Sequence, residues 1–315
     1  MTIDETSRKP RIAVLLGTFN GARFLDEQLQ SLAAQDVAHL DIYASDDGST
    51  DDTLAILGRW KTTWRKGVFE ISAGPGKGFS ENFRTLVMAA GTRDDADFVA
   101  CCDQDDIWDA DKLSAAIAAL SDAGDRPAVY FSRTRLIDAN GRPFGVSPLF
   151  RRQPGFRNAV VQSIGGGNTM VLNAAGTALF AESARRTSFV AHDWWGYIIV
   201  SGAGGYVRYD PEPHISYRQH EANSVGSNVG MRARLKRLGR QFDGAFAGWN
   251  TTNTAALGRC LDLLSPEARA TLIEFTEMRQ ARSLAGVRQL LRSGIRRQTV
   301  QGNIALAIAV ALGMT

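Results

Sequence analysis

The chain has 315 residues, of which 44% are hydrophobic and 22% are charged, with a formal net charge of +3. These values are ordinary for a globular protein, and the length can hold one large domain or one and a half, with a sizeable core. The three cysteines, two of them adjacent, exclude a disulfide framework and favour a reduced, cytoplasmic setting. The polar first residues, which include acids, predict no signal peptide.

From residue 11 to residue 131, short apolar runs alternate with segments whose apolar residues recur at helical spacing. Ser80 is expected to cap the third helix of this series, and Gly91 to end it. Such alternation predicts an α/β fold with a mainly parallel sheet and helices on both faces. The expected strands are 12–16, 40–44, 68–71, 97–102 and 128–131, and the expected helices are one from about residue 24, then 51–60, 81–90 and 109–120.

The pattern changes after residue 131. Asn140-Gly141 predicts a hairpin turn, and Gly165–Asn168 a flexible loop. A short strand, a helix from Asn173 and a late strand at 206–209 are expected next. From about residue 231 the chain is predicted to be helical, with helices such as 231–246 and 266–284.

Positive charge is concentrated in the last part of the chain. Residues 231–315 carry 13 Lys and Arg against 5 Asp and Glu, a balance of +8, which leaves −5 for residues 1–230. A basic region of this kind faces an anionic surface such as lipid headgroups, or it is a helical appendage with a solvated basic face. The helix faces carrying Leu235, Leu238 and Phe242 favour peripheral membrane docking.

The longest apolar run extends from Ile304 to Met314. It is too short to span a bilayer. It therefore packs in a core or lies on a membrane surface, and packing in the core is the favoured prediction.

In a parallel sheet the ligand site lies beyond the carboxyl ends of the strands. Three polar loops are expected there: Thr18–Gly21, Asp46–Ser49 and Asp103–Asp106. The last of these contains three carboxylates, which suit a hard cation such as Mg²⁺ or Mn²⁺. The alternative is a solvated acidic loop before helix 109–120, with Asp109 as the cap.

Asp46 and Asp47 could accept hydrogen bonds from a pyrimidine N–H or a ribose hydroxyl. Residues 49–52 are expected to cap the next helix, which leaves these two acids without a capping role. Asp193 stands before two tryptophans, which suits a partly desolvated general base or, alternatively, a helix N-cap. His220 would be a metal ligand, a phosphate contact or a structural side chain.

Two nucleotide-binding classes are disfavoured. The chain has no Gly-x-Gly-x-x-Gly dinucleotide signature after its first strand and no Walker-type Gly-Lys-Ser/Thr. Gly74–Gly78 is glycine-rich, but no hydroxyl residue follows Lys77. A hydride-transferring enzyme and a P-loop nucleotidase are therefore not expected.

Taken together, the motifs resemble family 2 glycosyltransferases of the GT-A fold. The Asp-Gln-Asp-Asp-Ile-Trp and His-Asp-Trp-Trp forms look most like bacterial rhamnosyltransferases and related enzymes of surface polysaccharide assembly. The matching pieces, in the family's order, are Thr18–Gly21, Asp46–Ser49, Asn82-Phe83, Asp103–Trp108, Gly166–Asn168, His192–Trp195 and Tyr217–His220.

The resemblance implies a domain plan. Residues 1–10 would be a tail, 11–225 the GT-A domain and 226–315 a basic helical region. Within the GT-A domain, 11–131 would be the nucleotide-binding half and 132–225 the acceptor-binding half.

The resemblance also assigns roles. Asp193 would be the catalytic base, and Asp105 and His220 would bind a divalent metal, Mg²⁺ or Mn²⁺. His192 departs from the pattern, because many family members have Glu before the base. The implied nucleotide-binding residues are Thr18, Phe19, Asn20, Asp46, Asp47, Asn82 and Asp103. The implied acceptor-binding residues are Gly166, Gly167, Asn168, Trp194 and Trp195.

The implied activity is an inverting, metal-dependent transfer of a sugar, such as rhamnose, from a dTDP- or UDP-sugar. The acceptor would be a saccharide or a lipid-linked saccharide, reached from the cytoplasm or from the inner face of the cell membrane. A nucleic-acid partner is not expected. Two other functions compete: a nucleotidyltransferase, which normally needs a glycine-rich basic loop that Leu16–Phe19 does not offer, and a non-catalytic sugar-nucleotide-binding protein.

Overall fold

The computed structural model describes residues 9–93, 95–220, 245–281 and 283–315. The first part is built from alternating strands and helices, as predicted. In chain order these elements are β1 (Arg11–Thr18), α1 (Ala22–Ala33), β2 (His39–Asp46), α2 (Thr53–Thr63), β3 (Phe69–Ala73), α3 (Phe79–Ala90), β4 (Phe98–Cys102), β5 (Ile107–Trp108) and α4 (Lys112–Leu120).

The middle part completes the sheet, and the last part is helical. The hairpin predicted at Asn140-Gly141 joins β6 to β7, and Gly141 has the positive φ of 78° that such a turn favours. The elements here are β6 (Ala128–Ile137), β7 (Pro143–Val146), α5 (Phe156–Ala159), β8 (Val171–Asn173), α6 (Ala174–Arg186), α7 (His192–Gly202), β9 (Tyr206–Arg218), α9 (Ala245–Gly258), α10 (Pro266–Ala281), α11 (Ser283–Ser293) and α12 (Val300–Ala311).

All the described strands belong to one sheet. Its order is β3-β2-β1-β4-β8-β6-β9-β5, with β7 paired to β6 outside this path. The strands of the first half, β3, β2, β1 and β4, are parallel, whereas β8 is antiparallel to both β4 and β6. The sheet is therefore parallel in the first half and mixed beyond it, and β6 runs across the expected boundary at residue 131.

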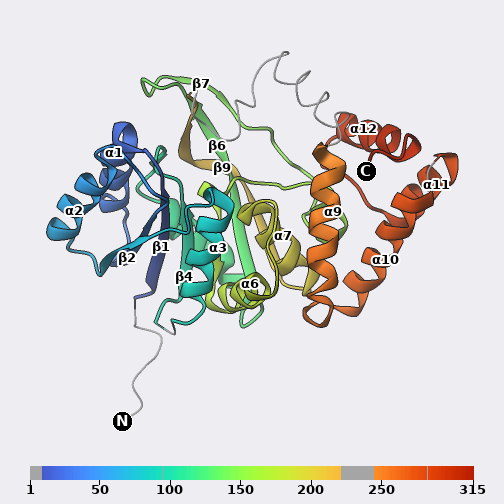
Figure 1. The fold of residues 1–315 in the computed structure, drawn as a ribbon, viewed down its shortest axis with the longest axis horizontal. Coiled ribbons are helices and arrows are strands. Elements are labelled where there is room, and N and C mark those ends of the chain that lie inside the picture. The colour runs from blue at the N-terminus through green and yellow to red at the C-terminus, as the bar shows by residue number, and fades with distance from the viewer. Residues whose placement is uncertain (1–8, 94, 221–244, 282) are drawn as a thin grey trace, which may run out of the picture.

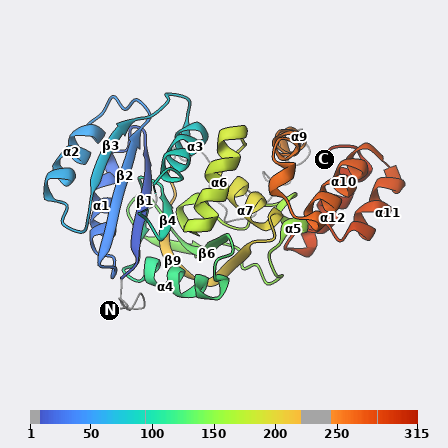
Figure 2. The same cartoon turned by 90° about the horizontal axis from the view of Figure 1, so that it is seen from below.

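Each face of the sheet carries its own hydrophobic cluster. Along β1, Ile12, Val14 and Leu16 point to one face and Ala13 and Leu15 to the other, because successive side chains of a strand alternate. Helices α1, α2 and α4 cover the first face, and α3, α6 and α7 cover the second (Figures 1 and 2). The near-continuous apolar run of β1 is thus explained by burial on both faces.

The C-terminal helices extend the second cluster. Phe246 of α9, Phe275 of α10 and Leu306 of α12 belong to it, and these helices lie at the end of the molecule away from α2 (Figures 1 and 2). The expected helix 231–246 and the residues Leu235, Leu238 and Phe242 lie outside the described residues, apart from the start of α9. None of the helices in the described ranges is long and apolar enough to cross a membrane.

Several predicted helix starts are wrong. Helix α3 begins at Phe79 with Gly78 as its N-cap, so Ser80 lies inside the first turn and its hydroxyl donates to the Phe189 carbonyl (3.0 Å). Helix α4 begins at Lys112 with Asp111 at the N-cap position, not Asp109. The reason is a long-range pairing: the chain first forms the two-residue strand β5, which pairs with residues 215 and 216 of β9 and delays the start of the helix.

Candidate active site

The three predicted loops meet at one edge of the sheet. Strand β1 lies between β2 and β4, and all three run parallel, so their carboxyl ends lie side by side. Thr18, at the end of β1, donates from Oγ1 to Oδ1 of Asp46, at the end of β2 (2.9 Å). The acidic turn at residues 103–106 follows β4 directly. This is the edge where an open α/β sheet binds its ligand.

Asp106 holds the acidic turn in place. Its side chain is fully buried and accepts hydrogen bonds from Asn168 Nδ2 (2.6 Å) and from the backbone N–H of Arg218 (3.0 Å). Burial, followed by the charges of Asp105 and Asp103, raises the pKa of Asp106. This carboxylate therefore joins the turn to β9 and to the 166–168 segment, and it faces protein on both sides.

Arg218, at the end of β9, holds the same turn through the Asp105 carbonyl. Only 2% of the residue is exposed. Its Nε donates to the Asp105 carbonyl (2.9 Å), its Nη2 pairs with Glu27 of α1 (2.5 Å), and its guanidinium lies 4.7 Å from the Phe24 ring centroid. A buried, planar cation with several partners fixes the backbone of the acidic turn relative to α1 and β9.

Asp105 and His220 face one another. Their Oδ2 and Nε2 atoms are 2.7 Å apart, and the two side chains are 15% and 14% exposed. The His220 ring also packs against Phe24, with centroids 4.9 Å apart. The structure therefore brings together the two residues that the sequence resemblance implied as metal ligands.

Asp103 is half-buried and is subject to the charges of both Asp105 and Asp193. Burial, then the charge of Asp105, then the charge of Asp193 raise the pKa of Asp103 to about 7. Acids this close repel one another unless a cation joins them. A cluster of acids whose charges oppose one another suits a ligand that brings positive charge.

Asp193 sits in the first turn of α7, so the alternative of an N-cap role is wrong: the N-cap is Ala191. Burial raises the pKa of Asp193 to about 6. Hydrogen bonds from the backbone N–H groups of Trp194 and Asp193 and from the Ser163 hydroxyl oppose this rise, because they favour the ionised form. A carboxylate with this pKa is ionised at neutral pH and still basic enough to accept a proton.

Gln104 is a site residue that the sequence did not single out, although it stands inside the acidic motif. Its side-chain amide accepts from the Phe19 N–H (2.8 Å) and donates to the Phe19 carbonyl (2.9 Å). A Cβ on Gly21 would collide with it. Gln104 therefore ties the loop after β1 to the loop after β4, and leaves the Phe19 side chain 55% exposed.

Asp46 and Asp47 are buried and bonded within the protein. Asp46 accepts from Thr18, from the Ser49 hydroxyl (2.6 Å) and from the Ser49 N–H (2.8 Å). Asp47 accepts from the Gly76 and Gly78 N–H groups, both at 2.7 Å. The two acids therefore shape the loop at 46–49 and the glycine-rich loop at 74–78.

One residue of the 49–52 segment, Asp51, meets the prediction that this segment caps α2. Its carboxylate accepts from the Thr53 N–H (3.0 Å), the first amide of the helix, and from the Thr53 hydroxyl (2.5 Å). Asp52 occupies the N-cap position, but its side chain makes no capping hydrogen bond. Ser49, another member of the segment, is bound to Asp46 and holds the loop instead.

Asn20 and Asn82, two further predicted nucleotide-binding residues, are placed differently. Asn20 is exposed, has the positive φ of 47°, and its Oδ1 accepts from the Thr50 N–H (2.8 Å). Asn82 is buried, and its amide exchanges hydrogen bonds with the Ser45 hydroxyl (2.5 Å) and carbonyl (2.9 Å). Asn20 therefore borders the site, and Asn82 braces β2 behind it.

Trp194 and Trp195 lie in the hydrophobic core. Trp195 is fully buried and its Nε1 donates to the Ser183 hydroxyl (3.0 Å), while the Trp194 Nε1 donates to the Ala159 carbonyl (2.7 Å). Both indoles are satisfied by protein, so they anchor α7 and do not face an acceptor. The sequence could not separate this role from acceptor binding, because both place aromatic residues beside the base.

The glycine segment lies against His192. Gly166 is exposed, Gly167 is buried, and a Cβ on Gly167 would collide with the His192 ring. His192 stacks on Phe83 with centroids 3.9 Å apart, and burial lowers its pKa to about 3, so the ring is neutral. Gly167 thus provides the space into which the residue before Asp193 packs.

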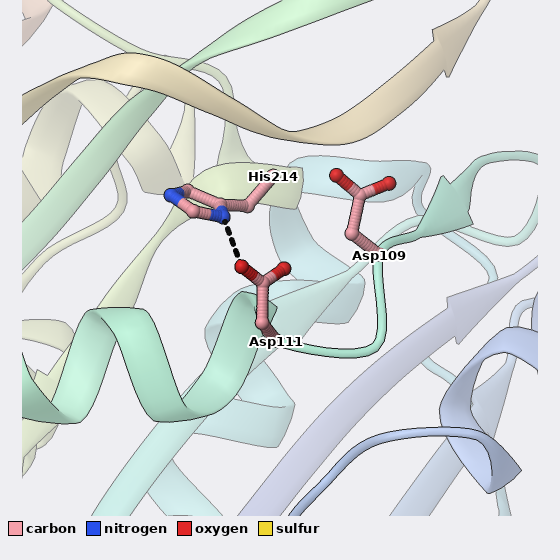
Figure 3. Close-up of side chains that lie close together, drawn as sticks. All are labelled: Asp109, Asp111 and His214. Carbon is pink, nitrogen blue, oxygen red and sulfur yellow. Dashed lines mark ion pairs between the residues drawn. The ribbon is translucent and has the colours of Figure 1, made fainter.

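A second acidic group lies at the start of α4. Asp109, Asp111 and His214 place their ligand atoms within 4.8 Å of one another (Figure 3). His214 Nδ1 is 3.2 Å from Asp111, and Arg135 forms an ion pair with Asp109. Because a cation of the protein already neutralises Asp109, this group serves to join α4 to β6 and β9.

A comparison with family models decides the class of protein. The model described as "Glycosyl transferase family 2" matches residues 13–175, which is about half of the chain and includes the acidic turn. The chain belongs to glycosyl transferase family 2. A relative from Shigella flexneri named "dTDP-rhamnosyl transferase RfbG" is 30% identical over 231 residues, covering 71% of this chain and 78% of the relative.

Solved structures support the fold of this glycosyltransferase. TarS 1-349 of S. aureus, in complex with UDP-GlcNAc, is 16% identical with a TM-score of 0.53, covering 90% of this chain and 79% of TarS. The mannosyltransferase PcManGT of Pyrobaculum calidifontis, in complex with GDP-Man and Mn²⁺, is 19% identical with a TM-score of 0.50, covering 97% and 76%. The GT-A-type α/β fold predicted from the sequence is confirmed.

Proposed function

We propose that this glycosyltransferase transfers a sugar from a nucleoside-diphosphate donor with inversion at the anomeric carbon, and that Asp193 is its general base. The observation that carries the proposal is the placement of Asp193. His192, the residue before Asp193, packs against Gly167, and the neighbouring Asn168 donates to Asp106 of the acidic turn (2.6 Å). The charge of Asp193 also raises the pKa of Asp103. These contacts support placing Asp193 next to the acidic turn.

The nucleotide side of the site would be the carboxyl edge of β1, β2 and β4. Phe19 and Asn20 are exposed there and free to contact a base or ribose. The buried members of the set would act by shaping the loops that contact the nucleotide, with Asp103 nearest to the ribose. The full proposed set is Thr18, Phe19, Asn20, Asp46, Asp47, Asn82 and Asp103.

A divalent metal, Mg²⁺ or Mn²⁺, fits the residues present. Asp105 and His220 offer one carboxylate oxygen and one imidazole nitrogen in direct apposition, and the raised pKa of Asp103 marks an excess of negative charge. Oxygen ligands suit both ions, and imidazole is tolerated by Mn²⁺. Asp105 and His220 would hold the ion, which would supply positive charge for the leaving diphosphate.

The reaction follows from what the side chains can do. Asp193 accepts the proton of an acceptor hydroxyl as the oxygen of that hydroxyl bonds to the anomeric carbon. The bond from the anomeric carbon to the diphosphate oxygen breaks, and its electron pair leaves with the nucleoside diphosphate. Attack from the face opposite the diphosphate inverts the configuration. The buried turn held by Asp106 and Arg218 keeps the leaving-group side in a fixed position relative to α7.

The donor and acceptor are proposed from the relatives. The 30% identity to a protein named as a dTDP-rhamnosyl transferase supports dTDP-rhamnose as the first donor to test, ahead of UDP-sugars. The acceptor would be a saccharide or a lipid-linked saccharide of surface polysaccharide synthesis. Gly166, Gly167 and Asn168 border the side of the site where it would bind. The enzyme would work in the cytoplasm, in peripheral contact with the inner face of the cell membrane.

A donor screen tests the proposal. Thermal stability of the purified chain is measured with dTDP-rhamnose, UDP-sugars and GDP-sugars, each with and without Mn²⁺. We expect stabilisation by one sugar nucleotide that depends on Mn²⁺ and is lost in Asp105→Ala. Products formed from that donor are then examined for anomeric configuration. Retention of configuration, or donor binding that is the same with and without Mn²⁺, would contradict the proposed mechanism.

A further inference from the structure

Two exposed aromatic side chains approach the start of α7 from different helices. Phe79, the first residue of α3, is 46% exposed, and Trp249 of α9 is 41% exposed. The centroid of the Phe79 ring lies 6.4 Å from that of His192, and the centroid of Trp249 lies 6.4 Å from that of Trp194, both edge to face. His192 and Trp194 are the residues directly before and after Asp193. We call Phe79 and Trp249 the aromatic pair.

Helix geometry places the aromatic pair on either side of Asp193. Successive side chains of a helix are about 100° apart, so Asp193 projects between His192 and Trp194. These two neighbours are buried, whereas Asp193 is partly exposed. Along the molecule, α7 lies between α3 and α9 (Figures 1 and 2). The accessible carboxyl group is therefore flanked by one exposed aromatic side chain from each neighbouring helix.

The backbone on both sides of Phe79 is anchored. The Gly78 N–H donates to Asp47 Oδ2 (2.7 Å), and the Ser80 hydroxyl donates to the Phe189 carbonyl (3.0 Å). These bonds fix the start of α3 to the end of β2 and to the segment before α7. A side chain held in this way loses less conformational entropy when a ligand packs on it.

Trp249 is held by the docking of α9 on the start of α7. Phe246 stacks on Trp194 with centroids 6.5 Å apart and ring planes 10° from parallel, and Asn253 Oδ1 accepts from the Val190 N–H (3.5 Å). Residues three, four and seven positions apart share one side of a helix. Trp249 therefore lies between two positions of α9 that contact α7 or the segment before it, yet its own ring stays exposed.

Aromatic faces suit the rings of a saccharide. A pyranose carries C–H groups on its faces and hydroxyls around its rim, and an aromatic ring has a negative face that attracts polarised C–H groups. Binding sites of this kind combine apolar aromatic surface with a small number of polar groups that fix orientation. Here Asp193 supplies a polar group between the two aromatic side chains. The nucleotide edge has its own exposed aromatic side chain, Phe19.

We propose that Phe79 and Trp249 bind the sugar rings of the acceptor and present one acceptor hydroxyl to Asp193. The proposal rests on the proposed function, because it takes Asp193 as the base that accepts the proton of that hydroxyl. It also gives the buried Trp194 a different role from the predicted one: Trp194 contacts Trp249 and does not itself face the acceptor.

The first test is saturation-transfer NMR of the full chain with three saccharide probes. These are methyl α-L-rhamnoside, methyl β-D-glucoside and methyl N-acetyl-β-D-glucosaminide, each with dTDP and Mn²⁺ present. We expect saturation of the ring C–H protons of at least one probe, and Phe79→Ala and Trp249→Ala should each weaken its binding at least ~5-fold. Phe79→Tyr and Trp249→Phe keep an aromatic face and should restore binding. Ile273→Ala, at a 59% exposed position on α10, is the matched control and should bind like the wild type.

The second test uses the bound saccharide as acceptor and dTDP-rhamnose as donor. Both alanine variants should raise the KM for the acceptor at least ~5-fold while kcat and the calorimetric Kd of the donor stay within about twofold, because a contact made equally before and during transfer is lost. An unchanged acceptor KM, or a loss of donor affinity as large as that of acceptor affinity, would overturn the proposal. So would the absence of saturation transfer from the wild type to every probe.

Asp193→Asn separates this proposal from the proposed function. It should bind the saccharide like the wild type and lose kcat. If Asp193→Asn keeps its kcat while the alanine variants still lose saccharide binding, the assignment of the base fails and the aromatic pair stands. If the alanine variants bind the saccharide like the wild type while Asp193→Asn loses kcat, the aromatic pair fails and the base stands.

Discussion

Replacing Asp193 with Asn tests the proposed chemistry most directly. Asparagine keeps the size of the side chain and its place in the first turn of α7, but it cannot accept the acceptor proton. A positioned general base contributes ~10²–10⁴-fold to rate, so we expect kcat to fall by that factor. Donor affinity should stay within about 3-fold, because Asp193 raises the pKa of Asp103 and its removal favours the ionised form of that neighbour.

The pH profile gives the same prediction a second readout. The pKa of Asp193 is raised to about 6, so the wild-type base is ionised at pH 7.5 and about nine-tenths protonated at pH 5. The rate at saturating donor should therefore fall about tenfold per unit below pH 6. In Asp193→Asn the residual rate should lack the fall centred near pH 6, because the group that titrates there is gone, and only the titration of Asp103, whose pKa is raised to about 7, should remain.

The assay measures release of nucleoside diphosphate at saturating donor and acceptor, alongside calorimetric titration of the donor. Asp125→Asn, at an exposed position after α4, is the matched control and should behave as the wild type. The reasoning would be refuted by a variant that keeps kcat within tenfold, or by one that loses donor binding as severely as turnover.

The other predictions concern the supports of the site. Asp105→Ala should abolish metal-dependent donor binding, read by titrating Mn²⁺ in the presence of donor; an unchanged Mn²⁺ midpoint would remove Asp105 from the ligand set. Arg218→Met should destabilise the protein by about 2–3 kcal/mol, since it removes buried hydrogen bonds while its partner Glu27 is half exposed; thermal unfolding measures this, and an unchanged Tm would contradict it. Gly167→Ala should lower stability and kcat together through its collision with His192, and His192→Ala in the same chain should recover most of the lost stability; failure of the second change to recover it would show that the collision is not the cause.

Much of the fold could be predicted because its signals are local. The run Ile12–Leu16 is apolar throughout, and burial on both faces of a parallel sheet requires that pattern. Asn140-Gly141 predicted the β6–β7 hairpin for an equally local reason, a turn that needs positive φ. The helix starts were less predictable. Ser80 is a good N-cap by type, yet its hydroxyl is used by the Phe189 carbonyl, a partner 109 residues away.

Some features of the site were also predictable from the local sequence, whereas others depend on residues far away in the chain. That the acidic turn ends a strand follows from its sequence alone, because Phe98–Cys102 is apolar and residues 103–106 are not. The different burial and contacts of the three acids in this turn do not follow from the local sequence. Asp106 is buried because Asn168 and the backbone of Arg218 reach it, from 62 and 112 residues away. Arg218 stands in the Tyr217–His220 motif, but the sequence gave no sign of its burial, because a buried arginine depends on the partners that the fold supplies.

The acids of the acidic turn differ in their contacts, and this difference would couple departure of the nucleoside diphosphate to activation of the acceptor. Asp106 is bound by protein, Asp105 meets His220, and Asp103 is half-buried. The charges of Asp105 and Asp193 both disfavour the ionised form of Asp103. A positive charge brought to Asp105 with the donor would offset the repulsion from Asp105 and would favour ionised Asp103. The remaining neighbour of Asp103 is Asp193, the proposed base. Donor binding would therefore act on the same cluster of charges in which Asp193 titrates, and the proposed leaving-group side and acceptor side would be linked electrostatically through the half-buried carboxyl group of Asp103.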